Sequence, residues 1–163
     1  MSSKGGVLRK FMTNFSCFEE IFLFIQILLL ATILPAMLKL LSLPRLLKML
    51  TPSDLKVCNN QNIERIRDNI VKYTDYIFAR NFWIYKNTCL KRSLILYHFL
   101  RKLGIIVYVY FGVRYDEKFP DREAKKKLEA HSWLVYKGKA YLEKTTELTE
   151  SYKVIYCFPD KME

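Results

Sequence analysis

The stretch TCLKRSLILYHFLRKLG, residues 88–104, decides the fold because it places a cysteine at the start of one long helix. The pattern predicts a helix over residues 90–103, and Gly104 directly after it is a typical helix-ending residue. Cys89 then lies at the helix N-terminus, where N–H groups and the helix dipole favour a thiolate. Residues 105–111 are β-branched and aromatic, and they predict a strand buried on both sides.

The chain has only two histidines, so the base for a cysteine nucleophile follows by elimination. His98 comes nine residues after Cys89 in the same predicted helix, which puts it on the opposite side and roughly 13 Å along the axis. A base must come within about 3 Å of the proton that it takes, or act through one water. The sequence therefore predicts His131 as the base.

A carboxylate to orient His131 is expected from the hairpin that follows it. A three-residue loop at residues 136–138 would pair His131 directly with Glu143, whereas a two-residue turn at 137–138 would pair it with Lys144. Directly paired side chains have Cβ atoms about 5 Å apart. The first register predicts a triad of Cys89, His131 and Glu143. Asn87 is a candidate for the oxyanion hole with the Cys89 N–H, and equally a helix cap.

The net charge of +11 predicts an anionic partner, and residues 81–115 contain no Asp or Glu. An ordinary solvated basic face explains this distribution equally well. No signature of RNA or DNA binding is present, so we expect no nucleic-acid partner. The candidate substrate-binding residues are Lys91, Arg92, Arg114 and Trp133.

The four cysteines lie far apart, with no CxxC pair and no histidine at zinc-ligand spacing. This spacing argues against a structural zinc site and against a disulfide framework, as expected in a reducing cytosol. We therefore expect no metal, no cofactor and a cytoplasmic location. The cysteines are Cys17, Cys58, Cys89 and Cys157.

Residues 18–34 are nearly all apolar, and Pro35 and a basic, leucine-rich stretch to residue 50 follow them. Residues 21–38 are borderline for spanning a hydrocarbon core, which needs about 20 residues. Three interpretations compete: a membrane span, an anchor on the membrane surface, and a hydrophobic helical hairpin packed on the domain or on a partner. The packed form is favoured, with membrane contact through residues 18–50 as the alternative. The segment lacks a small-residue cleavage site, which argues against a removable signal peptide.

The remaining patterns also predict helices and strands, so the expected fold class is α+β. Ile and Tyr recur at three- and four-residue intervals over residues 63–77, which predicts an amphipathic helix. The charged residues 116–129 predict a loop or a short exposed helix, and residues 152–158 a last strand. We divide the chain into a hydrophobic N-terminal helical region, 1–55, and a domain that carries the cysteine chemistry, 56–163.

Four motifs in order carry a resemblance: CLKRSL at 89–94, LRKLGI at 100–105, YFGVR at 110–114 and AHSWL at 130–134. From about residue 83 to residue 143 the chain resembles the transglutaminase-like cysteine peptidases of lasso-peptide biosynthesis. The resemblance implies a papain- or transglutaminase-like fold, in which the helix bearing Cys89 packs on an antiparallel sheet bearing His131 and Glu143.

The resemblance also implies a leader peptidase, which cuts a ribosomally made precursor so that a separate ATP-dependent macrolactam cyclase can act on the freed core. By position, Cys89 would be the nucleophile, His131 the base and Glu143 the acid, where the family usually has Asp. Nothing before Cys89 looks like a leader-recognition domain, so the chain resembles the split form, which needs a free-standing recognition protein. Chemistry alone leaves open a transglutaminase-type acyl transferase and a non-catalytic, membrane-associated scaffold protein.

Overall fold

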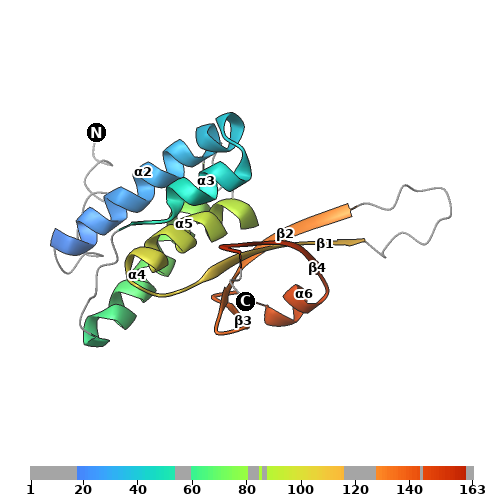
Figure 1. The fold of residues 1–163 in the computed structure, drawn as a ribbon. Helices are drawn as coiled ribbons and strands as arrows, with labels where there is room; N and C mark the ends of the chain where they lie inside the picture. The colour runs from blue at the N-terminus through green and yellow to red at the C-terminus, as the bar shows by residue number, and fades with distance from the viewer. Residues whose placement is uncertain are drawn as a thin grey trace, which may run out of the picture.

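The computed structural model describes residues 18–53, 60–80, 85, 88–115, 128–143 and 145–160. Helix α5 lies between the other long helices and the sheet (Figure 1). This arrangement confirms the α+β class. The helices are α2 (Phe18–Leu40), α3 (Leu43–Leu50), α4 (Asn60–Ala79), α5 (Cys89–Lys102) and α6 (Thr146–Glu150), and the strands are β1 (Tyr108–Tyr115), β2 (Leu128–Tyr136), β3 (Lys139–Tyr141) and β4 (Lys153–Phe158).

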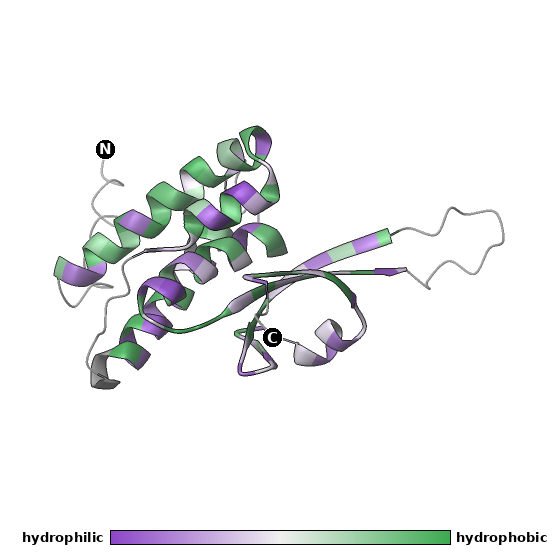
Figure 2. Cartoon of the chain, in the orientation of Figure 1, coloured by the Kyte–Doolittle hydropathy of each residue, from purple (hydrophilic) through white to green (hydrophobic). Residues whose placement is uncertain are grey.

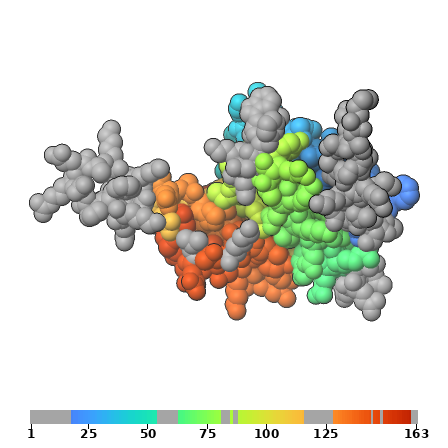
Figure 3. Space-filling model, turned by 180° about the vertical axis from the view of Figure 1, so that it is seen from behind, coloured from blue at the N-terminus to red at the C-terminus, as the bar shows by residue number. Residues whose placement is uncertain are grey.

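Within the described ranges the strands form one antiparallel sheet in the order β3-β2-β1-β4. The pairing of β1 with β2 sets Gly112 opposite His131. Seen from behind, the green and yellow-green helical layer meets the orange and red sheet along one face (Figure 3). Along β2, His131 and Trp133 alternate with Ser132 and Leu134, and it is Leu134 that belongs to the core shared with the helices.

Helix α5 forms as the sequence predicts. The Thr88 hydroxyl caps its N-terminus by accepting a hydrogen bond from the Lys91 N–H at 3.3 Å. Gly104 follows its C-terminus with a φ of 82°, a left-handed conformation that glycine adopts without steric cost. The helix is held in place by its apolar side chains, which are fully buried in the core: Leu94, Ile95, Leu96, Tyr97 and Leu100.

The strand after α5 begins later than predicted, at Tyr108 and not at residue 105. The Ile105 N–H bonds to the carbonyl of Leu100 and so helps to close the helix, and the Val107 N–H bonds back to Ile105. Ile106 is 58% exposed, so this segment is not buried on both sides. These residues serve as the turn between α5 and β1.

Helices α2 and α3 share one continuous hydrophobic core with α4, α5 and the sheet. Within the described residues, these two helices thus pack on the rest of the chain. On α2 the core-facing residues are Phe24, Ile27, Ala31 and Leu34, while Phe22, Ile25, Leu29 and Ile33 are exposed. Pro35 lies inside α2 and does not end it. Figure 2 shows the helix green over most of its length, and by length and composition alone it could also cross a membrane.

The remaining expectations concern the rest of the chain. The amphipathic helix is confirmed as α4, in which Ile70, Tyr73 and Ile77 are buried. The last strand is confirmed as β4, Lys153–Phe158. Of the segment expected as a loop or short helix, residues 116–127 lie outside the described residues, and residues 128 and 129 belong to β2.

Candidate active site

Cys89 is the first residue of α5, and its half-buried thiol is free. The pKa of this thiol is lowered from 9.0 to about 7, chiefly by its hydrogen bond with His131. Burial acts in the opposite direction, and a hydrogen bond with the Ser132 backbone adds to the lowering. The N-terminal position thus brings the sulfur to strand β2, where both partners lie.

His131 lies on β2 among aromatic side chains. Its ring stacks on Trp133 at 5.8 Å between centroids and 15° between planes, and it faces Tyr152 at 5.3 Å. Gly112, opposite His131, leaves room for these rings, because a Cβ there would come within 2.9 Å of both Trp133 and Tyr152. The imidazole is therefore held on its flat faces, and its edge is left to the polar partners.

Glu143 reaches His131, but not through the predicted register. The turn has two residues, with Lys137 at φ 50° and Gly138 at φ 79°, and it pairs Leu134 with Tyr141. This left-handed pair of residues fits the two-residue turn that joins twisted strands. Continued ladder pairing would set His131 opposite Lys144, as in the alternative register.

The strand ends before that pairing can form. Strand β3 stops at Tyr141, and Leu142 adopts a φ of 59°, a left-handed conformation that is rare for leucine. This turn in the backbone directs Glu143 toward β2, where its Oε2 lies 3.6 Å from His131 Nε2. The expected neighbours are brought together by an irregular residue and not by the sheet.

The charge state of the pair follows from these contacts. The pKa of His131 is raised from 6.5 to about 9, first by Cys89 and then by Glu143. Since the Cys89 pKa is about 7, a thiolate beside an imidazolium is the main form between these two values. A thiolate is the reactive form of cysteine, and an imidazolium can protonate a leaving group. The three side chains can thus carry out acyl transfer through sulfur.

A family model described as "Transglutaminase-like superfamily" matches residues 27–157, most of the chain. The chain belongs to the transglutaminase-like superfamily. No curated protein and no solved structure matches it. The match begins within α2 and runs across residue 55 into the sheet, so α2 and α3 belong to the region shared with this superfamily.

Two of the candidate substrate-binding residues in this transglutaminase-like chain have carboxylate partners. Arg92 forms ion pairs with Asp75 at 2.7 Å and with Glu143 at 3.6 Å. Arg114 pairs with Glu129 at 2.8 Å and covers the ring of Tyr152.

The other predicted residues lie as follows. Trp133 is 3% exposed and supports the His131 ring. Lys91 lies in the first turn of α5, and Asn87 lies outside the described residues. In the described part of the chain, no three His, Cys, Asp or Glu side chains are arranged to hold a metal ion.

His98 faces away from Cys89, as the helix geometry requires. Its Nδ1 lies 2.7 Å from the carbonyl oxygen of Leu50, at the end of α3. Burial lowers the pKa of His98, so its ring is neutral where it packs.

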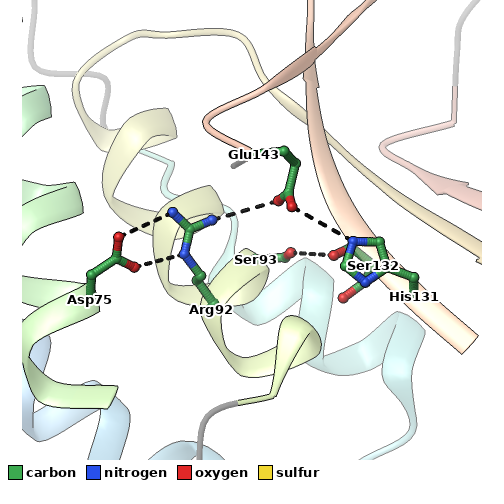
Figure 4. A network of polar contacts seen from close by, with 6 residues as sticks. All are labelled: Asp75, Arg92, Ser93, His131, Ser132 and Glu143. Carbon is green, nitrogen blue, oxygen red and sulfur yellow. Dashed lines mark hydrogen bonds and ion pairs between the residues drawn. The ribbon is translucent and has the colours of Figure 1, made fainter. Parts of the chain in front are cut away.

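One further contact of the site was not predicted from the sequence. The Ser93 hydroxyl, on α5, donates to the carbonyl oxygen of Ser132 at 2.9 Å (Figure 4). This buried bond ties α5 to β2 beside both Cys89 and His131. Serine in the second turn of a helix gives no local signal of such a bond.

Proposed function

We propose that this chain is a cysteine peptidase that removes the leader from a ribosomally made lasso-peptide precursor. The observation that carries the chemistry is the pairing of Cys89, with a pKa of about 7, and His131, with a pKa of about 9, beside Glu143. A superfamily that includes cysteine peptidases supports the same reaction class.

In the proposed reaction the Cys89 thiolate attacks the carbonyl carbon at the leader–core junction and forms a carbon–sulfur bond. The carbon–nitrogen bond breaks, and the His131 imidazolium gives its proton to the leaving core amine. Water then attacks the thioester while neutral His131 takes a proton from it, and the carbon–sulfur bond breaks. This step restores the Cys89 thiolate beside the His131 imidazolium and frees the leader acid, which loses its proton to solvent. Glu143 stabilises the imidazolium at the stages where His131 carries the proton.

The substrate is proposed from the four motifs between residues 89 and 134 that resemble lasso-peptide leader peptidases. The partners of such a peptidase are the leader of the precursor, a free-standing recognition protein and an ATP-dependent macrolactam cyclase. A cytoplasmic location suits these partners. The net charge of +11 favours an acidic segment in one of them.

The competing function is a transglutaminase-type acyl transfer, which the matched family's description favours. The same thioester would form, but an amine would replace water in the second step. The mass of the released leader separates the two reactions, because hydrolysis leaves a free carboxylate and transfer leaves an amide. A scaffold protein with an inert thiol would give neither product.

The test is incubation of the protein and the recognition partner with a candidate precursor, followed by mass spectrometry of the leader. We expect release by the native protein, none by Cys89→Ala or His131→Ala, and slowed release by Glu143→Ala. Cys157→Ala is the matched control, because Cys157 is also a half-buried free thiol but lies on β4. Release by Cys89→Ala or His131→Ala would overturn the assigned roles.

A further inference from the structure

The Arg92 guanidinium lies between two carboxylates from different parts of the fold (Figure 4). Its Nε and Nη2 donate to the two oxygens of Asp75, on α4, at 2.7 and 3.4 Å. Its Nη1 lies 3.6 Å from Oε1 of Glu143. The Arg92 side chain is only 14% exposed and that of Glu143 15%, so both are largely shielded from water.

The two oxygens of Glu143 have different partners. Oε1 faces Arg92, and Oε2 faces His131 at 3.6 Å. A planar guanidinium suits this arrangement, because one edge binds a carboxylate through two N–H groups while another nitrogen points elsewhere. Lysine has a single compact charge and cannot present two such edges.

Glu143 needs an anchor of this kind because the sheet does not hold it. Strand β3 ends at Tyr141, and the left-handed Leu142 turns the chain out of the ladder. A glutamate side chain also has one more rotatable bond than an aspartate. We propose that Arg92 is a positioning residue, which holds the Glu143 carboxylate against His131 while Asp75 holds Arg92.

This inference rests on the proposed roles of Cys89, His131 and Glu143, but not on any particular substrate. It replaces the expectation that Arg92 binds substrate, because its donors already face two carboxylates. Asp75 lies on α4, so the proposal makes a helix without catalytic residues part of the support for the site.

The test follows the protonation of His131 without any peptide, by proton NMR of the imidazole rings over pH 5–10. The chain has two histidines, so His98→Gln assigns both signals. The groups that face His131 are Cys89 from α5, Glu143 after β3 and Tyr152 before β4, with Arg114 of β1 over the Tyr152 ring. None of these groups is altered in the Arg92 variants.

A positioning role and a simple charge effect predict opposite shifts. Loss of a nearby positive charge alone would raise the His131 midpoint. If Arg92 positions Glu143, then Arg92→Met should lower it by about one pH unit, because the stabilising carboxylate is no longer fixed. Arg92→Lys should lower it by less, and Asp75→Asn should shift it in the same direction. Adding Arg92→Met to Glu143→Gln should lower it no further.

The control is Arg65→Met, which removes another arginine–carboxylate pair between helices, at 3.5 Å from Glu20, remote from His131. We expect it to leave the His131 midpoint unchanged. An unchanged or raised midpoint in both Arg92→Met and Arg92→Lys would overturn the positioning role. A native His131 midpoint near 6.5 would instead overturn the proposed triad, so the two failures can be told apart.

Discussion

Replacement of Gly112 by alanine tests how closely the aromatic support of His131 is packed. The new Cβ would lie 2.8 and 2.9 Å from two ring carbons of Trp133 and 2.9 Å from the Cβ of Tyr152. Both neighbours pack on the His131 ring, and Trp133 is buried, so neither can move without disturbing the imidazole.

Overpacking of this kind costs about 1–3 kcal/mol. Alanine also restricts the unfolded chain, which offsets about 0.4–1 kcal/mol of that cost. We therefore expect Gly112→Ala to lower the free energy of unfolding by about 1–2 kcal/mol. For a chain of this size that corresponds to a fall in Tm of roughly 2–8 °C. The measurement is thermal and urea unfolding, with the rate of leader release determined on the folded protein.

Gly138→Ala is the control, since its Cβ would meet nothing within 4 Å. Its φ of 79° strains an alanine by about 1–2 kcal/mol, so both variants lose comparable stability. Only Gly112→Ala should also slow the reaction, because only it displaces the rings around His131. A Gly112→Ala protein with native stability and native activity would refute the packing argument.

Three further outcomes are expected. At pH 6, a Cys89 pKa of about 7 in place of 9.0 gives roughly a hundredfold more thiolate. A thiolate of lower pKa is also a weaker nucleophile, which reduces this advantage by about tenfold. His131→Ala should therefore slow Cys89 alkylation by iodoacetamide about tenfold, and equal rates would contradict the pairing. Leader release should follow a bell-shaped pH profile with limbs near 7 and 9, and a single limb would count against two titrating groups. Because the pKa of His98 is lowered, its contribution to the free energy of unfolding falls as the pH drops below 6.5. The contribution of His131 is lost instead as the pH rises from 6.5 to 9. In urea unfolding, His98→Gln should lose less unfolding free energy than the native protein between pH 6.5 and pH 5. An equal loss in the two proteins would refute this.

The helix that carries Cys89 could be predicted because its signals are local. An apolar core face and a terminal glycine act within one element, and Gly104 adopts the expected left-handed conformation. The cap in the structure is Thr88, whereas the sequence suggested Asn87. The exclusion of His98 also followed from helix geometry alone, and this ring contacts the carbonyl of Leu50.

The route by which Glu143 reaches His131 could not be predicted. The two-residue turn at Lys137 and Gly138 was one of the two registers that the sequence allowed. Leu142 also has a positive φ, which its side chain does not favour, and the sequence carried no sign of it. The partnership of Arg92 with Asp75 joins residues on different helices, and charge pattern alone does not reveal such tertiary contacts.

Helix α2 carries a consequence for how its hydropathy should be used. A hydropathy profile scores each residue without its tertiary contacts. It therefore cannot distinguish a helix that covers a hydrophobic core from a membrane-spanning helix. Phe24 packs edge-on against Tyr73 of α4, and lifting the helix away would wet the apolar side chains beneath it. Each large side chain so uncovered would forfeit about 1.5–3 kcal/mol. Any lipid contact compatible with this fold is therefore limited to the exposed side of α2. Deletion of α2 would expose the apolar side chains of the remaining helices to water.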